Sequence, residues 1–444
     1  MVKKPEAAPA SHPSRETIDL LLNRGEAAEI DSLLQKANQD YLYWDRFKQL
    51  TMPQGVTPEV AWTVLKLTRE ISRRRTQITA VDGNRFWYSL TDELQRSLMV
   101  IDQQAGGWIG TTAPEISRNV KRTYLLSRLM EEAIASSQIE GAATTRREAK
   151  EMLRTGREPQ TRSERMILNN YLTIGRMREL SDKPLSPALL LELQASLTAE
   201  TLNNPSEVGR FRTDEDDDIV VGNQTGEVLH VPPRASTLRD QLDELCRYAN
   251  EDGEQFVHPV LKASMLHFWL AYLHPFCDGN GRTARALFYL HALSHGYWLF
   301  EYVSISRVIL RRKAQYARAF LYSEIDDADL TYFLTFHVHA IEKALQEFWE
   351  YVERKAQEDR ELESSVSKDG GFNYRQRALL SRAMKDSGTR FTIESHRASH
   401  NVAYATARSD LLELADRGYF VQLREGRSFV FVPAGDLRIR LESR

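Results

Sequence analysis

The strongest constraint on the fold is a glycine-rich loop that joins two apolar helical segments. Residues 266–273 are largely apolar, the loop lies within HPFCDGNGRTAR at 274–285, and apolar residues resume at helical spacing with Leu287 and Leu290. A Gly-Asn-Gly sequence that opens a helix leaves unpaired backbone N–H groups pointing at one spot, where the helix dipole adds positive potential. Such a helix end binds anions, most often phosphate. The sequence therefore predicts a phosphate-binding helix–loop–helix unit.

The polar side chains of this segment extend the prediction. Arg282 and Arg285 lie one helical turn apart and suit a di- or triphosphate. Asp278 offers a hard carboxylate oxygen for Mg²⁺ that bridges phosphates. His274 ends the first helix and can be neutral near pH 7, so it can accept a proton. The alternative is a tight turn with surface charges, and it leaves this concentration of functional groups unexplained.

The segment resembles the active-site motif of the Fic (Fido) family, His-Pro-Phe-x-Asp/Glu-Gly-Asn-Gly-Arg-x-x-Arg, and departs from it at no fixed position. The resemblance implies a protein adenylyltransferase that moves AMP from ATP to a hydroxyl of a target protein or of itself. The intact Gly-Asn-Gly favours nucleotide transfer over the other transfers of the family. The resemblance assigns His274 as the general base, Asp278 as the Mg²⁺ ligand, and Gly279, Asn280 and Gly281 as an anion hole that the asparagine side chain helps to form. It assigns Arg282 and Arg285 as ligands of the β/γ-phosphates, Phe276 as the loop anchor and Tyr316 as a residue near adenine.

Residues 136–141, SSQIEG, resemble the inhibitory pattern of the same family, Ser/Thr-x-x-x-Glu-Gly/Asn. The resemblance implies an N-terminal inhibitory helix over about 116–141, with Ser136, Glu140 and Gly141 as its signature. Glu140 would then pair with Arg285, a strong charge-assisted contact, and block productive placement of the γ-phosphate. The alternative is an ordinary surface acid near a helix end.

A β-hairpin is predicted at 218–233, because β-branched runs flank a glycine-bearing loop. With GRFR at 209–212, this hairpin resembles the family's flap, which takes the target segment as an added strand through main-chain hydrogen bonds. The alternative is a plain surface hairpin. The expected docking residues are Ile219, Val220, Val221, Gly222, Val228 and His230.

The predicted fold class is mainly α: a Fic-type helical core with a β-hairpin flap, followed by a small winged-helix domain. Helices are expected at 57–75 and 88–103, among others. The charged, serine- and glycine-bearing stretch before residue 372 suggests a linker. The expected parts are a disordered lead (1–16), an N-terminal helical region (17–112), the Fic-type core (113–355), the linker (356–371) and a winged helix-turn-helix (372–444).

The C-terminal region combines three short helical patterns with two alternating strands, which favours a winged helix-turn-helix. Residues 368–444 hold 14 basic and 9 acidic side chains, a net charge of +5, although the whole chain has a net charge of −3. Such a basic region is typical of DNA binding. The alternative is protein contact or a homodimer. The expected DNA contacts are Asn401, Tyr404, Thr406 and Arg408.

Two alternative functions follow from these features. One is a DNA-binding transcriptional regulator whose Fic-type core senses nucleotide. The other is removal of AMP, in which Glu140 positions a water molecule. A zinc site built on His267 and His274, seven residues apart with Cys277 close by, is disfavoured, because a histidine on an apolar helix is usually a core residue and no third ligand has suitable spacing.

Composition limits the remaining classes of protein. No apolar run approaches the ~18 residues of a membrane span, so no membrane association is expected. The N-terminal residues lack the apolar stretch of a signal peptide. Only two cysteines occur, Cys246 and Cys277, which excludes a disulfide framework and favours a reducing, cytoplasmic setting.

Overall fold

The computed structural model describes residues 3–10, 14–22, 28–106, 118–216, 219–223, 225–253, 255–368, 371–385, 388–425 and 428–442. The chain forms two compact units, Met1–Phe348 and Trp349–Arg444. The structure is mainly helical, as predicted, with three small antiparallel sheets among the described residues.

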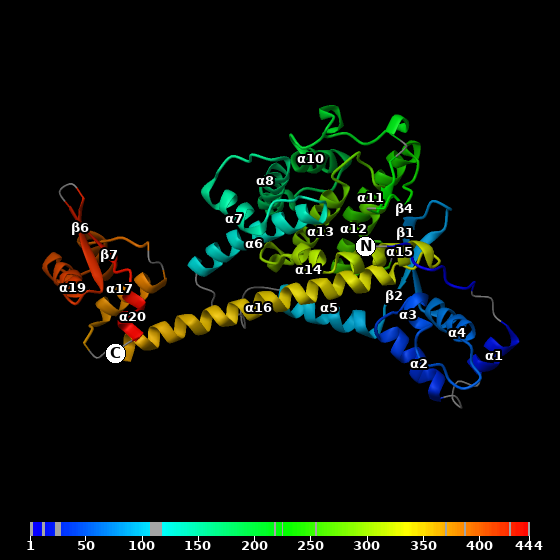
Figure 1. Ribbon diagram of the computed structural model, residues 1–444, viewed down its shortest axis with the longest axis horizontal. Helices are drawn as coiled ribbons and strands as arrows, with labels where there is room; N and C mark the ends of the chain where they lie inside the picture. The colour runs from blue at the N-terminus through cyan, green and yellow to red at the C-terminus, as the bar shows by residue number, and fades with distance from the viewer. Residues whose placement is uncertain are drawn as a thin grey trace. The chain divides into compact units, whose positions relative to one another are not determined.

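Two antiparallel neighbours, α12 (Pro259–Leu273) and α13 (Asn280–Ser294), form the centre of the first unit (Figure 1). Almost every residue of α12 is buried, because this helix is apolar on all faces and other helices cover it on several sides. The loop between α12 and α13 is thereby held inside the unit. The helices that contact this pair or one another around it are α6 (Arg118–Ile139), α8 (Arg162–Gly175), α9 (Met177–Leu180), α10 (Pro187–Thr198), α11 (Leu238–Asn250) and α14 (Ile305–Arg311).

The remaining elements of this unit are short or peripheral. The hairpin strands β3 (Val221–Gly222) and β4 (Val228–His230) pair antiparallel. Four short 3₁₀ turns lie at Pro205–Glu207, Asp214–Asp216, Ala235–Thr237 and Trp298–Glu301. The other helices are α1 (Arg15–Leu22), α2 (Ala28–Gln39), α3 (Trp44–Phe47), α4 (Pro58–Ile71), α5 (Asp92–Ala105), α7 (Arg146–Thr155), α15 (Lys313–Ile325) and the first part of α16 (Thr331–Lys368).

The N-terminal region is not purely helical, which corrects the prediction for 17–112. The expected helices at 57–75 and 88–103 are present as α4 and α5, but β1 (Arg73–Thr79) and β2 (Arg85–Ser89) lie between them and pair antiparallel. The sequence contains the reason: Asp82-Gly83 lies between the strands, and Gly83 has a φ of 84°. Asp-Gly between β-branched and aromatic residues is a strong hairpin signal.

The lead expected to be disordered is partly ordered. Within residues 3–10, the Glu6 carboxylate accepts hydrogen bonds from Trp44 Nε1 and Lys48 Nζ. The Tyr43 hydroxyl donates to the Glu6 carbonyl over 2.9 Å. These contacts hold the segment against a separate core that includes Trp62 and Phe47.

The predicted linker at 356–371 is helical over most of its length. Helix α16 continues through it as far as Lys368. The stretch is charged, but glutamate, glutamine, arginine and lysine all have high helix propensity. A charged composition excludes a buried core without excluding a helix.

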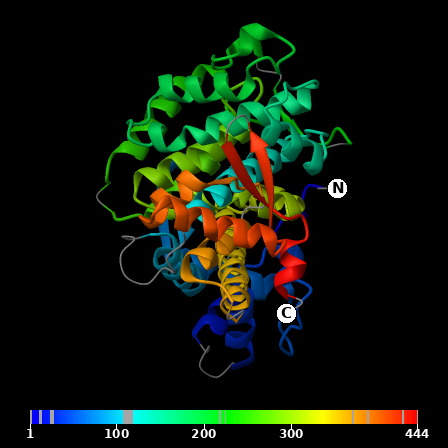
Figure 2. The ribbon, with the colours of Figure 1, turned by 90° about the vertical axis from the view of Figure 1, so that its left-hand side faces the viewer.

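The second unit has the predicted order of three helices and a two-stranded ribbon, drawn in red in Figure 2. The ribbon is extended by a short strand, β5, in the sheet order β5-β7-β6, and a last helix follows; neither addition was predicted. Its assignment as a winged helix stays a prediction. The elements are α17 (Tyr374–Lys385), β5 (Phe391–Thr392), α18 (Ile393–His400), α19 (Tyr404–Asp416), β6 (Phe420–Glu425), β7 (Ser428–Pro433) and α20 (Leu437–Glu442).

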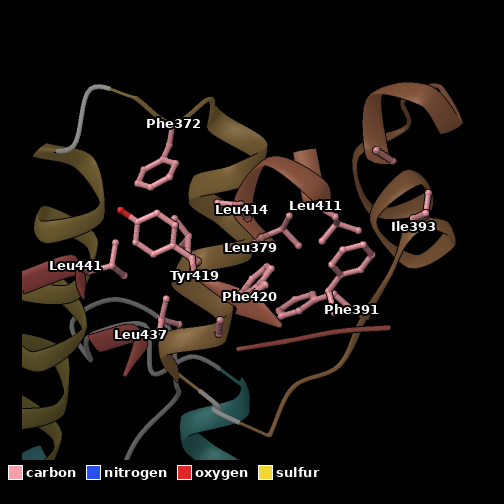
Figure 3. Close-up of a cluster of buried hydrophobic side chains, with 14 residues drawn as sticks. Phe372, Leu379, Phe391, Ile393, Leu411, Leu414, Tyr419, Phe420, Leu437 and Leu441 are labelled. Atoms are coloured by element: carbon pink, nitrogen blue, oxygen red, sulfur yellow. The ribbon is translucent and has the colours of Figure 1, made fainter. Parts of the chain in front are cut away.

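This unit has a hydrophobic core of its own (Figure 3). Phe391 stacks on Phe420 with ring centroids 5.2 Å apart, and Leu411 of α19 is fully buried beside them. Every described residue of this cluster lies between 372 and 441, within the second unit. Among the described helices of the whole chain, none combines the length and apolarity needed to cross a bilayer.

Leu411→Ala should destabilise the second unit alone, by about 2–5 kcal/mol, because the truncation leaves a cavity in a closed core. Hydrogen–deuterium exchange should show lost protection across 374–442 and unchanged protection in α12 and α13. Arg408→Ala, an exposed substitution on the same helix, is the matched control, with an effect within about 0.5 kcal/mol. An equal loss of protection in α12 would contradict a separate core.

Candidate active site

The loop between α12 and α13 has a defined shape. His274 follows α12 in the left-handed region (φ 47°), and Gly279 precedes α13 with a φ of 89°. Phe276 is fully buried and stacks on Phe211 with ring centroids 5.3 Å apart. The phenylalanine therefore lies in the core, as the family resemblance implied.

Asn280 has a different contact from the one expected. Its Oδ1 accepts the Phe276 N–H over 2.9 Å, and its Nδ2 donates to the Phe276 carbonyl over 2.7 Å. Both polar groups of the amide are therefore engaged inside the loop. Its side chain closes the loop and does not face the anion cradle, which leaves the backbone N–H groups of the first turn of α13 to form that cradle.

A carboxylate lies on this cradle. Glu140 Oε1 accepts a hydrogen bond from Arg285 Nη2 over 2.8 Å. A Cβ atom at Gly281 would overlap Glu140 Oε1 and would lie 3.2 Å from Arg285 Nη1. The glycine is therefore what lets the carboxylate approach the start of α13.

The predicted pairing of Glu140 with Arg285 is thus present in the structure. Arg285 also donates from Nε to Ser136 Oγ and from Nη2 to the Ser136 carbonyl, both over 2.9 Å. Burial alone would raise the pKa of Glu140, but Arg285, Arg282 and Lys313 together hold it below its ordinary value. Gly141 has a φ of 95° and forms the turn after Glu140. Residues 116 and 117 of the expected inhibitory helix lie outside the described residues, and α6 is described from Arg118.

Arg282 is buried and points to another neighbour. Its Nη1 donates to the Leu197 carbonyl over 2.7 Å, and its Nη2 lies 3.4 Å from Asp278 Oδ1. Burial lowers the pKa of Arg282, and the charges of Asp278 and Glu140 oppose that effect. The two arginines therefore make different contacts: Arg285 meets the carboxylate of Glu140, and Arg282 joins the end of α10 to the loop.

Asp278 is suited to hold a cation at the edge of the cradle. Its side chain is 43% exposed, and its Oδ2 lies 3.5 Å from Arg162 Nη2. No cluster of three or more potential ligands is found within the described part of the chain. Mg²⁺ is commonly held through one or two carboxylates together with substrate phosphates, so a single accessible carboxylate fits this mode of binding.

His274 lies in an environment that favours its neutral form. Burial, followed by the positive charge of His230, lowers the pKa of His274 to about 4. Arg212 fixes the backbone beneath it, because Arg212 Nε donates to the His274 carbonyl over 2.9 Å. The guanidinium also donates to the carbonyls of Leu273 and Pro233, and the Arg212 N–H donates to the Pro275 carbonyl over 2.9 Å. The sequence does not predict this role of Arg212, because an arginine three residues after Gly209 is its only local signal.

The predicted flap is a short hairpin. The side chains of Val220 and Val228 are exposed. Ile219 and Val220 come before the paired strand β3. Val221 and Gly222 form β3. Asp218 and Gln224 lie outside the described residues.

His230 anchors the hairpin and is not available for docking, which corrects that prediction. Its Nδ1 lies 2.7 Å from Glu324 Oε2 and its Nε2 lies 2.8 Å from the Tyr272 carbonyl. Both partners can only accept, so the ring carries both protons. Burial lowers the pKa of His230, but Glu324 and the carbonyl raise it above its ordinary value overall.

Tyr316 lies beside the pair of Arg285 and Glu140. Its hydroxyl is 2.8 Å from His267 Nε2. Burial raises the pKa of Tyr316 to about 12, Arg285 lowers it and Glu140 raises it. Contact of Tyr316 with adenine stays a prediction.

The expected DNA contacts lie in the second unit. Asn401 follows α18 in the left-handed region with a φ of 49°. On α19, Tyr404 and Arg408 are exposed and Thr406 is half-buried. A nucleic-acid role for these residues stays a prediction.

Comparison with known proteins agrees with the loop geometry. Residues 184–292 match the Fic/DOC family. "Protein adenylyltransferase Fic" of Nematostella vectensis is 36% identical over 84 residues, which cover 19% of this chain and 18% of that protein. The protein of the same name from Drosophila yakuba is 35% identical over 94 residues, covering 21% of this chain and 17% of that protein. The chain thus spans less than a fifth of the length of these relatives.

Solved structures extend the likeness in fold. A Fic family protein from Desulfovibrio desulfuricans G20 has a TM-score of 0.51 at 20% identity, covering 78% of this chain and 97% of that one. Fic-1 (residues 134–508) from C. elegans has the same TM-score and identity, covering 78% of this chain and 90% of that one. At this identity the likeness concerns the fold.

The effect of Gly281→Ala on stability should change sign with the residue at position 140. In the native background the new Cβ overlaps the Glu140 carboxylate, so we expect a loss of about 1–3 kcal/mol. In a Glu140→Gly background the overlap is gone, and the higher helix propensity of alanine should make the same change neutral or stabilising by up to ~1 kcal/mol.

Urea unfolding of the four proteins of this double-mutant cycle measures the coupling. Gly296→Ala is a control with open space around the new Cβ but a positive φ of 83°, so its cost should be the same in both backgrounds. Additive effects of the changes at 281 and 140 would show that the carboxylate does not lie on the cradle.

Proposed function

We propose that the chain is a protein adenylyltransferase that transfers AMP from ATP to a hydroxyl side chain of a target protein or of itself, and that Glu140 inhibits it. The observation that carries the proposal is a carboxylate bound to Arg285 on the helix start beside Gly281, next to a neutral histidine. An anion cradle with an adjacent proton acceptor fits phosphoryl chemistry. The match of residues 184–292 to the Fic/DOC family and the names of the relatives support the same reaction.

In the proposed reaction His274 takes the proton of the attacking hydroxyl. The hydroxyl oxygen forms a bond to the α-phosphorus of ATP as the bond from that phosphorus to the bridging oxygen breaks. Pyrophosphate leaves with the electron pair of that bond, and His274 later releases its proton to solvent. Positioning and charge stabilisation supply most of the acceleration in such transfers.

The chain's own groups would share the developing charge. The N–H groups at the start of α13 would face the phosphates in place of Glu140, and Arg285 would exchange the carboxylate for a phosphate oxygen. Arg212 holds the backbone of His274 and Pro275 in place during the reaction. Mg²⁺ held by Asp278 would neutralise phosphate charge when bound.

The hairpin would present the target. Its exposed Val220 and Val228 lie on a segment that His230 fixes to Tyr272 and Glu324. An added target strand would pair with backbone groups there, which places a side-chain hydroxyl near His274 without a strict sequence requirement.

Inhibition would follow from competition for one anion site. Glu140 follows the last residue of α6, and Lys313 Nζ donates to the Ile139 carbonyl at the same helix end. The carboxylate is therefore held by its own charge partner and by its backbone, and phosphate must displace it.

Glu140→Gly should raise auto-AMPylation, measured as label from α-³²P-ATP on the purified protein. Adding His274→Ala should lower that activity by roughly 10²–10⁴-fold, because the general base is lost. Glu200→Gly is the matched control, since Glu200 also follows a helix and pairs with an arginine, Arg165, over 3.0 Å, but lies on the surface. Its labelling should equal that of the parent.

Absence of label on any protein in the Glu140→Gly variant would count decisively against AMP transfer. Removal of AMP makes the opposite prediction at the same residue. If Glu140 positions a water molecule, Glu140→Gly should abolish release of AMP from a modified target.

The pH dependence of transfer should report the low pKa of His274. A general base works only when unprotonated, so activity is lost as the pH falls through its pKa. Because that pKa is about 4 and Glu140 raises it, kcat/KM of the Glu140→Gly variant should stay constant from about pH 8 to about pH 5. Circular dichroism at each pH checks that the protein is folded. A midpoint near 6.5, the ordinary value for histidine, would contradict the proposed environment of His274.

A further inference from the structure

A chain of hydrogen-bonded side chains leads from Tyr316 into the core. The Tyr316 hydroxyl lies 2.8 Å from His267 Nε2, and His267 Nδ1 lies 3.1 Å from His337 Nε2. His337 Nδ1 lies 2.9 Å from Ser264 Oγ, and Ser264 donates to the Val260 carbonyl over 2.8 Å. Helices α12, α15 and α16 each contribute to the chain. The proposed reaction assigns no role to either histidine.

The inner end of the chain fixes the direction of every hydrogen bond. The Val260 carbonyl can only accept, so the Ser264 hydroxyl donates to it and must accept from His337 Nδ1–H. His337 Nε2 is then the acceptor for His267 Nδ1–H, provided both rings are neutral. His267 Nε2 in turn must accept from the Tyr316 hydroxyl.

Burial keeps both rings neutral. It lowers the pKa of His337 to about 3. It also lowers the pKa of His267 well below its ordinary value, and the neighbouring His337 and the positive charge of Arg285 act in the same direction. One arrangement of protons therefore satisfies the whole chain.

The consequence reaches the active site. The Tyr316 hydroxyl donates its only proton to His267 Nε2, so it can offer only lone pairs to Arg285. Arg285 lowers the pKa of the Tyr316 hydroxyl, which is the effect of a nearby cation. Arg285 Nη1 is buried and has no hydrogen-bond acceptor of good geometry among the described residues, whereas Nε and Nη2 are bound to Ser136 and Glu140.

We propose that His267, His337 and Ser264 are positioning residues that fix the Tyr316 hydroxyl as a donor to His267, so that only its lone pairs are left for the unpaired Nη1 of Arg285. When Arg285 exchanges Glu140 for phosphate, the hydroxyl would accept from Nη1 and orient the guanidinium toward the β- and γ-phosphates. The second half of this statement rests on the proposed function, because it requires that ATP binds at the cradle. The arrangement of protons along the chain does not depend on the proposed function.

The proton arrangement can be tested without activity. Full-length protein labelled with ¹⁵N-histidine should show His267 and His337 as neutral Nδ1–H tautomers from about pH 6 to pH 8, with assignments from single His→Gln variants. Ser264→Ala removes the acceptor that fixes His337, so a second tautomer should appear. An Nε2–H tautomer or an imidazolium at either residue in the parent protein would overturn the proposal.

Nucleotide binding tests the link to Arg285. In the Glu140→Gly background, Tyr316→Phe should weaken ATP binding about tenfold, the effect of one lost hydrogen bond to a charged group. Binding of AMP should not change, because AMP lacks the β- and γ-phosphates; a general loss of structure would weaken both. Isothermal titration calorimetry measures the two affinities.

Tyr322→Phe is the matched control. Tyr322 lies on the same helix, and its hydroxyl donates to Asp45 rather than toward the site. Its ATP affinity should equal that of the parent. Unchanged ATP affinity in Tyr316→Phe would overturn the link between Tyr316 and Arg285. If the Glu140→Gly parent binds ATP but transfers no AMP, the proposed function fails and the inference stands.

Discussion

The structure depends on one electrostatic requirement at the start of α13. A helix N-terminus inside a folded unit has unpaired N–H groups and a positive potential. Burying them without a hydrogen-bond acceptor or a negative charge nearby costs free energy. Here the negative charge is the carboxylate of Glu140. It can approach the helix start because residue 281 is a glycine, and Arg285 Nη2 donates to its Oε1 over 2.8 Å. The contact of Arg285 with Ser136 on α6 and the turn at Gly141 flank that carboxylate on either side.

Sequence reasoning reaches furthest where chemistry is local. His274, Asp278 and Gly279 lie within one loop, Gly281 lies in the first turn of α13, and their spacing predicts a phosphate site. The pairing of Glu140 with Arg285 joins residues 145 positions apart, and only the family pattern at 136–141 indicated it. The contacts of Asn280 and His230 were missed because an asparagine in a loop, or a histidine in a strand, has several partners that the sequence cannot rank. The Tyr316–His267–His337 chain joins three helices and has no local signature.

The misjudged segments have equally specific causes. Asp82-Gly83 is a strong hairpin signal that was overlooked in favour of helical spacing on either side. The charged end of α16 was assigned to a linker because it cannot form a core, although residues that solvate well also form stable helices. The N-terminal region is tied to the rest of its unit by buried charge: Lys66 Nζ lies 3.0 Å from Asp326 Oδ1, and Arg69 donates to the Tyr332 hydroxyl. Such pairs arise from tertiary contact alone.

On the proposed function, the Glu140 carboxylate before the turn at Gly141 has a further property. Because Glu140 belongs to the same chain as the cradle, its local concentration does not fall on dilution, and only a change in the protein can alter it. On the proposed function, the apparent affinity for ATP equals the intrinsic affinity multiplied by the fraction of molecules whose cradle is open. Each ~1.4 kcal/mol by which a binding event strains the end of α6 would then raise that fraction about tenfold while the cradle is mostly closed. On the proposed function, the contact would act as a thermodynamic set point whose threshold could be tuned from outside the catalytic loop.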